Sequence, residues 1–243
     1  MAHELGAYEG APWRVVEAQH VVSTRKLVDS DAEQQILEEL VERGKPPIPA
    51  VDGFEGLHFL LFSSFRYPPL RHGSRFATRW EPSLWYGAEE LRTAFAEVAY
   101  YRLVFLEGTR AKLAPLMVEL SAFQARVRTR KAADLTRAAA RRLEALRSKV
   151  SYEATQALGR ELRDAGCEAV RYLSARDADG GVNLALFTPR AFAEKRPRPP
   201  QTWLCVATAL GVEVRRKDYF VRESFAFARA QFEVDGAIPH PAR

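Results

Sequence analysis

Apolar residues recur at helical spacing in several stretches of the chain. Within residues 30–43, Ser30 and Glu33 form a capping box, and Gly44 with the prolines that follow it ends the segment. We expect this helix to bury an aliphatic stripe made of Ile36, Leu37, Leu40 and Val41. Further helices are predicted over about 89–101, 136–149 and 151–166.

Other stretches favour strands. Residues 57–63 form a short, nearly continuous apolar run of the kind found in buried strands, and residues 120–129 alternate between apolar and polar positions. The remaining predicted strands are 84–88, 101–107, 168–174, 182–187, 202–210, 212–221 and 224–234. The segment DADGG at 177–181 has no downstream glutamate suited to calcium and is interpreted as a hairpin turn.

Consecutive strands, with helices between only some of them, predict a mixed α/β (α+β) fold. The pattern lacks the strict strand–helix alternation of a doubly wound parallel sheet. We interpret residues 1–55 as a helical N-terminal extension and residues 56–243 as one main domain.

Composition narrows the class of protein. The 243 residues are 47% hydrophobic and 28% charged, typical of a globular chain. No apolar run is long enough for a membrane span, and the N-terminus does not resemble a signal peptide. The separated cysteines Cys167 and Cys205 favour free thiols, so we expect a cytoplasmic protein.

The net charge of +5 suits an anionic small molecule, an acidic protein or nucleic acid. Nucleic acid is the weakest of these, because the basic stretch 126–149 is interleaved with apolar positions as on a solvated helix face. The chain has no dinucleotide-binding glycine motif, P-loop or nucleophile elbow, and its five histidines lack metal-ligand spacing. We therefore expect no metal.

One constellation remains after these exclusions. Arg66 and Arg75 lie in a loop, Tyr86 ends a predicted strand, and Glu97 lies at the flank of an apolar helix stripe; Ser174 closes a later strand. Each has an ordinary structural explanation, such as a surface ion pair, a core aromatic or a turn cap. Arginine forks, however, match phosphate oxygens bidentately.

The five residues, in that order within FR, SRF, YGA, AFAE and YLS, resemble the RES domain. This family is named for its arginine, glutamate and serine, and its members are typically toxins of bacterial toxin–antitoxin pairs. The resemblance covers about residues 57–192, and the flanking segments are similar to a longer RES subfamily. Many relatives have Gly-Gly-Arg-Trp where this chain has GSRF.

The resemblance implies a split, strand-rich core like that of ADP-ribosyltransferases, with NAD as substrate and inorganic phosphate or water as acceptor. It implies that Arg75, Arg66 and the Tyr67 hydroxyl hold the pyrophosphate and that Tyr86 contacts nicotinamide or ribose. Glu97 would stabilise positive charge at the anomeric carbon, and Ser174 would bond ribose or phosphate. The implied partner is a helical, DNA-binding antitoxin, and homo-oligomers are possible.

The residue types suit this chemistry independently. Nicotinamide leaves NAD as a neutral group, so no general acid is needed, and one carboxylate can stabilise an oxocarbenium-like sugar. The same half-reaction also serves mono-ADP-ribosylation of a protein, and the sequence does not separate these acceptors. A catalytically silent basic binding module is the third interpretation.

Overall fold

A ten-stranded sheet runs through the part of the chain that the computed structural model describes, which is residues 4–18, 27–49, 52–111 and 115–240. The strand order is β1-β5-β6-β7-β3-β2-β4-β8-β9-β10, and β5–β6 is its one parallel pair among the described strands. The strands are β1 (Gly6–Gly10), β2 (Trp13–Glu17), β3 (Trp85–Ala88), β4 (Leu116–Gln124), β5 (Val127–Asp134), β6 (Ala169–Leu173), β7 (Val182–Leu186), β8 (Gln201–Thr208), β9 (Gly211–Arg216) and β10 (Ser224–Ala228).

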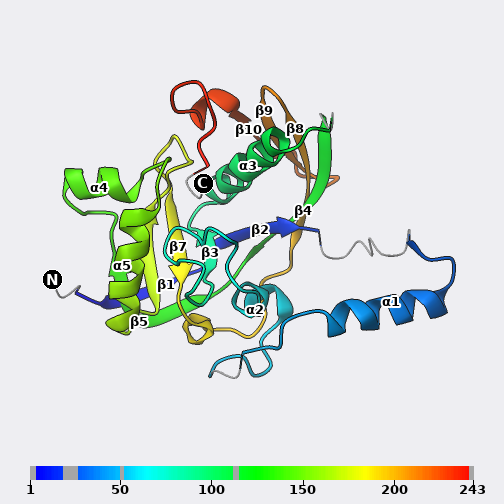
Figure 1. Cartoon of the computed structure of the whole chain (residues 1–243), viewed down its shortest axis with the longest axis horizontal. Helices are drawn as coiled ribbons and strands as arrows, with labels where there is room; N and C mark the ends of the chain where they lie inside the picture. The colour runs from blue at the N-terminus through cyan, green and yellow to red at the C-terminus, as the bar shows by residue number, and fades with distance from the viewer. Residues whose placement is uncertain (1–3, 19–26, 50–51, 112–114, 241–243) are drawn as a thin grey trace.

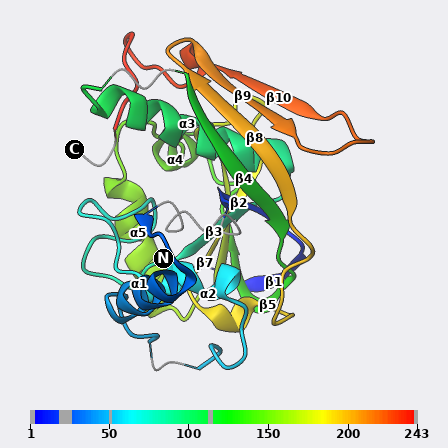
Figure 2. The same ribbon diagram turned by 90° about the vertical axis from the view of Figure 1, so that its right-hand side faces the viewer.

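The described residues also form five α-helices (Figures 1 and 2). They are α1 (Asp31–Arg43), α2 (Phe59–Arg66), α3 (Leu91–Gly108), α4 (Ala140–Leu146) and α5 (Glu153–Asp164). Helix α3 covers the β8–β10 half, where Phe95 packs against Trp203, while α5 covers the β6–β7 half through Leu162. Three core clusters, which include residues of α3, α2 and α5 respectively, pack against the sheet.

The mixed α/β class predicted from the sequence is confirmed, and most predicted elements are present. Helices over 89–101, 136–149 and 151–166 correspond to α3, α4 and α5. Strands β3, β6, β7 and β8 lie within a residue or two of their predicted ranges. Patterns that pair a clear period with flanking turn residues were therefore sufficient to place these elements.

The predicted strand 57–63 is wrong, because this segment begins helix α2. His58 caps the helix by accepting a hydrogen bond from Leu60 N, and Leu61 and Phe65, one turn apart, are buried. A short apolar run has the same pattern in a buried strand and in a buried helix. Here the i, i+4 pair determines the structure, since it packs under β3.

The predicted strand 101–107 is also wrong, because α3 continues to Gly108. Phe95, Ala99 and Leu103 are spaced by four residues and are all at most 1% exposed. Leu103 therefore extends the buried stripe by another turn, and the helix follows it. The longer helix packs against the half of the sheet that contains β8, β9 and β10.

Three further strand predictions require correction. Residues 120–129 do not form one strand, since β4 ends at Gln124 and β5 begins at Val127. Between them Ala125 N donates to the carbonyl of Pro12, outside either ladder. The predicted strands 212–221 and 224–234 are shortened to β9 and β10, because residues 217–223 form the connecting turn and 229–231 a 3₁₀ turn.

The prediction that residues 1–55 form a helical extension is wrong for their first part. Residues 6–10 and 13–17 are strands β1 and β2, and β2 lies in the middle of the sheet between β3 and β4. These strands have only five residues each, too few for a clear period. The N-terminal segment therefore contributes to the main sheet instead of packing outside it.

Helix α1 forms with its predicted capping box, but its aliphatic stripe is not buried. Ile36, Leu40 and Val41 are 59%, 57% and 46% exposed, and α1 stands away from the other elements in Figure 1. Glu42 joins the helix to Arg66 of α2 at 2.9 Å. Amphipathic spacing specifies an apolar face, and tertiary contacts decide whether anything covers it.

Close packing between α5 and the loop at 73–77 fixes the loop that carries Arg75. A Cβ atom added at Gly159 would lie 2.1 Å from the carbonyl oxygen of Phe76, so the helix and the loop backbone touch. Gln156 of the same helix donates to the carbonyl of Ser74 at 3.0 Å. Helix α5 therefore acts as the rigid support of this loop.

Substituting Gly159→Ala should lower the free energy of unfolding by about 1–3 kcal/mol, because the methyl group overlaps backbone that cannot rotate away. Urea denaturation would measure the change. The matched control is Gly108→Ala at the end of α3, where an added Cβ meets nothing within 4 Å. There the alanine should be neutral or stabilising by up to about 1 kcal/mol through helix propensity, and equal losses at both glycines would contradict the packing argument.

Candidate functional site

A cavity of about 500 Å³ opens where β2, β3, α3 and the loop before β3 meet. Its wall combines aromatic and apolar side chains with few charges, a composition typical of small-molecule sites. The residues that line it are Trp13, Arg14, Val15, Ser64, Tyr67, Pro68, Pro69, Leu70, Gly73, Ser74, Arg75, Ser83, Leu84, Tyr86, Gly87, Ala94, Glu97, Val98, Tyr101, Tyr152, Tyr172 and Asn183. Glu97 is the one carboxylate among them.

Glu97 is held through one of its two oxygens. Its Oε1 accepts hydrogen bonds from Ser174 Oγ at 2.7 Å and from Asn183 Nδ2 at 2.6 Å. Among the described residues, no hydrogen bond reaches Oε2 of Glu97. The carboxylate is therefore fixed in orientation while one oxygen stays available to a ligand in the cavity.

Ser174 lies behind Glu97 and does not line the cavity. It is 0% exposed, and its Oγ accepts from the backbone N–H groups of Arg176 and Asp177, both at 3.0 Å. Asp177 in turn accepts from Thr93 in the first turn of α3. The turn after β6 thus ties the start of α3 to the group that orients Glu97, which explains how residues 77 positions apart meet.

Arg75 is buried and points into the cavity wall without a carboxylate partner in the described part of the chain. Its guanidinium donates to the carbonyls of Leu146, at 2.8 Å, and Ser148, at 3.2 Å. It also lies over the Tyr152 ring at 4.7 Å from the centroid. Carbonyls and an aromatic face orient the fork but leave its positive charge uncompensated.

Arg14 of β2 is a second cation in this wall, and the sequence analysis did not identify it. One of its terminal nitrogens donates to the carbonyl of Tyr86 at 2.6 Å, and the group lies 5.3 Å from the Trp85 ring centroid. Burial lowers the pKa of Arg14 to about 10, so it remains charged at neutral pH at an energetic cost. An anion in the cavity would offset that cost.

Three buried polar atoms of the cavity lining have no hydrogen-bond partner in the described chain: Arg14 Nε, Ser64 Oγ and Asn183 Oδ1. Buried polar groups are almost always paired, and each unpaired one costs about 1–3 kcal/mol. Their concentration in one cavity indicates a place for a polar ligand. Two of the three atoms can donate, and Asn183 Oδ1 accepts.

Tyr86 supports the loop that carries Arg75. Its hydroxyl accepts from Phe76 N at 3.2 Å and shares a hydrogen bond with Ser74 Oγ at 2.8 Å. Burial raises the pKa of Tyr86 to about 12, which keeps the phenol neutral. The hydroxyl of Ser74, the second residue of GSRF, therefore helps to hold Tyr86.

The structure brings most of the predicted site residues together. Tyr67, Arg75, Tyr86 and Glu97 line the cavity, and Ser174 contacts Glu97 from behind. Arg66 is not among the lining residues, because its guanidinium binds Glu42 and the carbonyl of Pro46. The chemical roles of all six remain predictions.

Sequence signals for the missed residues were weak. Arg14 stands in WRVV and Asn183 in VNLALF, each a polar residue inside a short apolar strand. A polar residue in such a run is unusual enough to warrant attention. Their strands are separated by more than 160 positions, so only the sheet order, with β3 between β2 and β7, brings them to one cavity.

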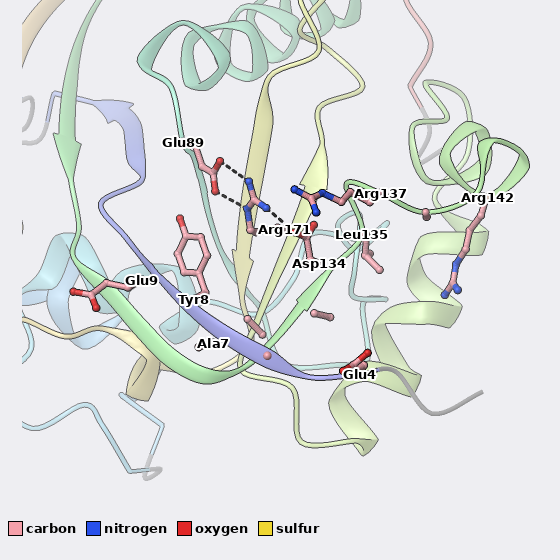
Figure 3. A pocket seen from close by; sticks show the side chains of 14 residues that line it. Glu4, Ala7, Tyr8, Glu9, Glu89, Asp134, Leu135, Arg137, Arg142 and Arg171 are labelled. Atoms are coloured by element: carbon pink, nitrogen blue, oxygen red, sulfur yellow. Dashed lines mark hydrogen bonds and ion pairs between the residues drawn. The ribbon is translucent and has the colours of Figure 1, made fainter.

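A second hollow of about 720 Å³ lies beside β1 and is shown in Figure 3. Its central cation, Arg171, is already neutralised: it bonds both oxygens of Glu89, at 2.7 and 2.9 Å, and Asp134 at 2.7 Å. Burial, with a contribution from Glu89, raises the pKa of Tyr8. None of its lining residues has an unpaired buried polar atom, so the cavity around Glu97 is the better candidate site.

Two other kinds of site were sought in the described residues. No group of three or more His, Cys, Asp or Glu side chains there could hold a metal ion. None of the helices within the described ranges has the length and hydropathy needed to cross a membrane.

Comparison with known proteins gives one family match. The family model of the RES domain matches residues 50–207, well over half of the chain. A chain from the crystal structure of the M. tuberculosis MbcT–MbcA toxin–antitoxin complex is similar with a TM-score of 0.45 and 15% sequence identity, over 84% of this chain and 87% of that one. No curated protein matches.

Removing the Ser174 hydroxyl should destabilise the protein, because it leaves two buried backbone N–H groups without their acceptor. We expect Ser174→Ala to lower the free energy of unfolding by about 1–3 kcal/mol in urea denaturation. Ser83→Ala is the control, since its hydroxyl makes one exposed bond to the Tyr67 carbonyl. A loss at Ser174 no larger than at Ser83 would show that this turn does not depend on the hydroxyl.

Proposed function

The chain belongs to the RES-domain family, and from this we propose that it cleaves the bond between nicotinamide and ribose in NAD. The observation that carries the proposal is the cavity itself. Within the described part of the chain, it combines one oriented carboxylate, two arginines without carboxylate partners, and three buried polar atoms that lack a hydrogen bond. A ligand that fills it should carry negative charge together with hydroxyl or amide groups.

NAD fits this description in size and chemistry. Its diphosphate is anionic, its riboses carry hydroxyls, and its nicotinamide carries an amide. A volume of about 500 Å³ lies within the range of 300–1,000 Å³ typical of small-molecule sites. We assign the diphosphate to Arg14 and Arg75, both of which can still donate hydrogen bonds.

Glu97 would act at the reacting carbon. The bond from the anomeric carbon to the nicotinamide nitrogen breaks, and its electron pair leaves with nicotinamide, which becomes neutral. The positive charge that develops on the sugar is stabilised by the carboxylate, whose Oε2 is available while Oε1 is held. A phosphate oxygen or water then bonds the anomeric carbon. When water is the acceptor, it gives one proton to the surrounding solvent as the new C–O bond forms.

Asn183 and the tyrosines complete the assignment. With its Nδ2 on Glu97, Asn183 leaves Oδ1 to accept a hydrogen bond from a ribose hydroxyl or from the carboxamide. Tyr101 and Tyr152 offer aromatic faces along the same wall. Ser174 acts through Glu97 and is a positioning residue in this scheme, in place of the direct ligand contact expected from the sequence.

The purified chain should release nicotinamide from NAD, and Glu97→Gln should reduce the rate by about 100-fold or more, because a neutral amide stabilises the developing charge poorly. Chromatography of the products with and without inorganic phosphate would measure this. Release that requires phosphate indicates a phosphorylase, and release without phosphate indicates hydrolysis. Label transferred from NAD to a protein would indicate an ADP-ribosyltransferase.

The control for this experiment is Glu107→Gln, the same substitution in the same helix, where the carboxylate pairs with Arg229 at the surface. Its rate should equal that of the unaltered chain. Full turnover by Glu97→Gln would contradict the proposal. So would the absence of nicotinamide release both with and without phosphate, together with the absence of protein labelling.

Arg14→Met should raise KM for NAD by about tenfold or more, because one charge-assisted hydrogen bond is worth about 1.5–3 kcal/mol. Initial rates over a range of NAD concentrations would show the change. Arg160→Met on the exposed face of α5 removes the same charge away from the cavity and should leave KM unaltered. An equal KM for NAD in the two variants would indicate that the diphosphate does not bind Arg14.

We further propose that the chain acts as a toxin held inactive by an antitoxin. Two uncompensated arginines in the cavity would accept an acidic carboxyl-terminal segment of such a partner, which would exclude NAD. Expression of the chain alone should then deplete cellular NAD and arrest growth, and Glu97→Gln should do neither. Growth arrest by both the unaltered chain and Glu97→Gln would show that toxicity does not depend on NAD cleavage.

A further inference from the structure

The two edges of the ten-stranded sheet are constructed differently. At one edge, β1 has a register irregularity between Gly6 and Tyr8, and Glu9 forms ion pairs with Arg126 and Arg128. Bulges and charges are the common means of preventing an edge strand from pairing with another chain. Strand β10, at the opposite edge, has neither feature.

The free side of β10 is uncharged and small. Arg216 N donates to the carbonyl of Glu223. In the β9–β10 register, the backbone N–H and C=O groups of Phe225 and Phe227 then point toward β9. Ser224, Ala226 and Ala228 therefore present their backbone N–H and C=O groups outward, and all three are exposed. No backbone hydrogen bond from another described element reaches these groups.

The turn that joins β9 to β10 exposes two aromatic side chains. Tyr219 is 99% exposed and Phe220 is 96% exposed, the highest values among the large hydrophobic residues of the described chain. The turn is nevertheless well ordered locally, because Asp218 accepts from the N–H groups of Phe220 and Val221 at 2.9 and 3.1 Å. Figure 2 shows this hairpin projecting beyond the other strands, with β10 on its outer side.

We propose that β10 pairs with β10 of a second copy of this chain, in antiparallel register about Ala226, to form a two-fold dimer with one continuous sheet. A two-fold axis places Ala226 opposite its own copy and Ser224 opposite Ala228 of the partner subunit. Small uncharged residues meet in every outward pair, so no like charges are opposed.

Charge and area favour this occupant. In the proposed register the hairpin turn of one copy lies beside the segment that follows β10 in the other. The next pair beyond Ser224 and Ala228 sets Glu223 opposite Arg229 of the partner subunit, so the first charged residues that meet across the axis have opposite signs. Each copy contributes two aromatic side chains, which can bury roughly 150–250 Å² each. Together with the paired strands, the buried surface area would reach the roughly 1,200–2,000 Å² of specific interfaces.

The test compares two double variants at the same two positions. Ser224→Lys with Ala228→Lys sets lysine against lysine across the axis, and should weaken dimerisation by about tenfold. Ser224→Glu with Ala228→Lys sets glutamate against lysine and should retain the dimer. Sedimentation velocity over a concentration series measures both, with circular dichroism to verify the fold. Leu210→Lys, exposed at the β8–β9 turn, controls for added charge.

The unaltered chain should sediment at twice the mass of one chain, and so should Leu210→Lys. A monomer at every concentration would overturn the proposal, as would equal weakening by the two double variants, because only the proposed register distinguishes them. Retention of the dimer by the lysine–lysine variant would place the interface elsewhere and also overturn it. None of these measurements depends on nicotinamide release, so their outcome is independent of the proposed function.

Discussion

Helix α3 carries one carboxylate into a wall of aromatic and apolar side chains, and two later segments supply the groups that hold it. Ser174, from the turn after β6, and Asn183, from β7, both donate to Oε1 of Glu97. The same turn reaches back to α3 through Asp177 and Thr93. A carboxylate fixed at one oxygen keeps the other in a constant position, which is what stabilisation of a developing charge requires.

The cavity also contains two arginines, which are positioned by groups other than Glu97. Arg14 and Arg75 are held by backbone carbonyls and aromatic rings instead of by acids, so the wall keeps positive charge close to Glu97 without neutralising it. The hollow beside β1 shows the contrast, because there Arg171 is saturated by Glu89 and Asp134. An arginine that already has acidic partners is poorly placed to bind a phosphate, whereas one held by neutral carbonyls retains its attraction for anions.

The proposed site and the proposed dimer edge lie on different parts of the same sheet. The cavity uses β2, β3 and β7 at its centre, where strands distant in sequence become neighbours, while β10 lies at the end of the strand order. The hairpin that β10 forms with β9 contacts the body through Phe225 and Phe227 under α3. Pairing at β10 would therefore extend the sheet without closing the cavity.

The sequence by itself determined most helices and strands, since period, caps and turn residues act over a few positions, as in α5 and β6–β7. It also identified Arg75, Tyr86, Glu97 and Ser174 as a group, through their resemblance to a family motif. Tertiary structure decided what local pattern leaves open: that residues 57–63 begin a helix, that β2 enters the middle of the sheet, and that the stripe of α1 stays exposed. It alone brought Arg14 and Asn183 to Glu97 and took Arg66 away to Glu42, because contacts between distant segments depend on strand order and packing, which no short stretch of residues encodes.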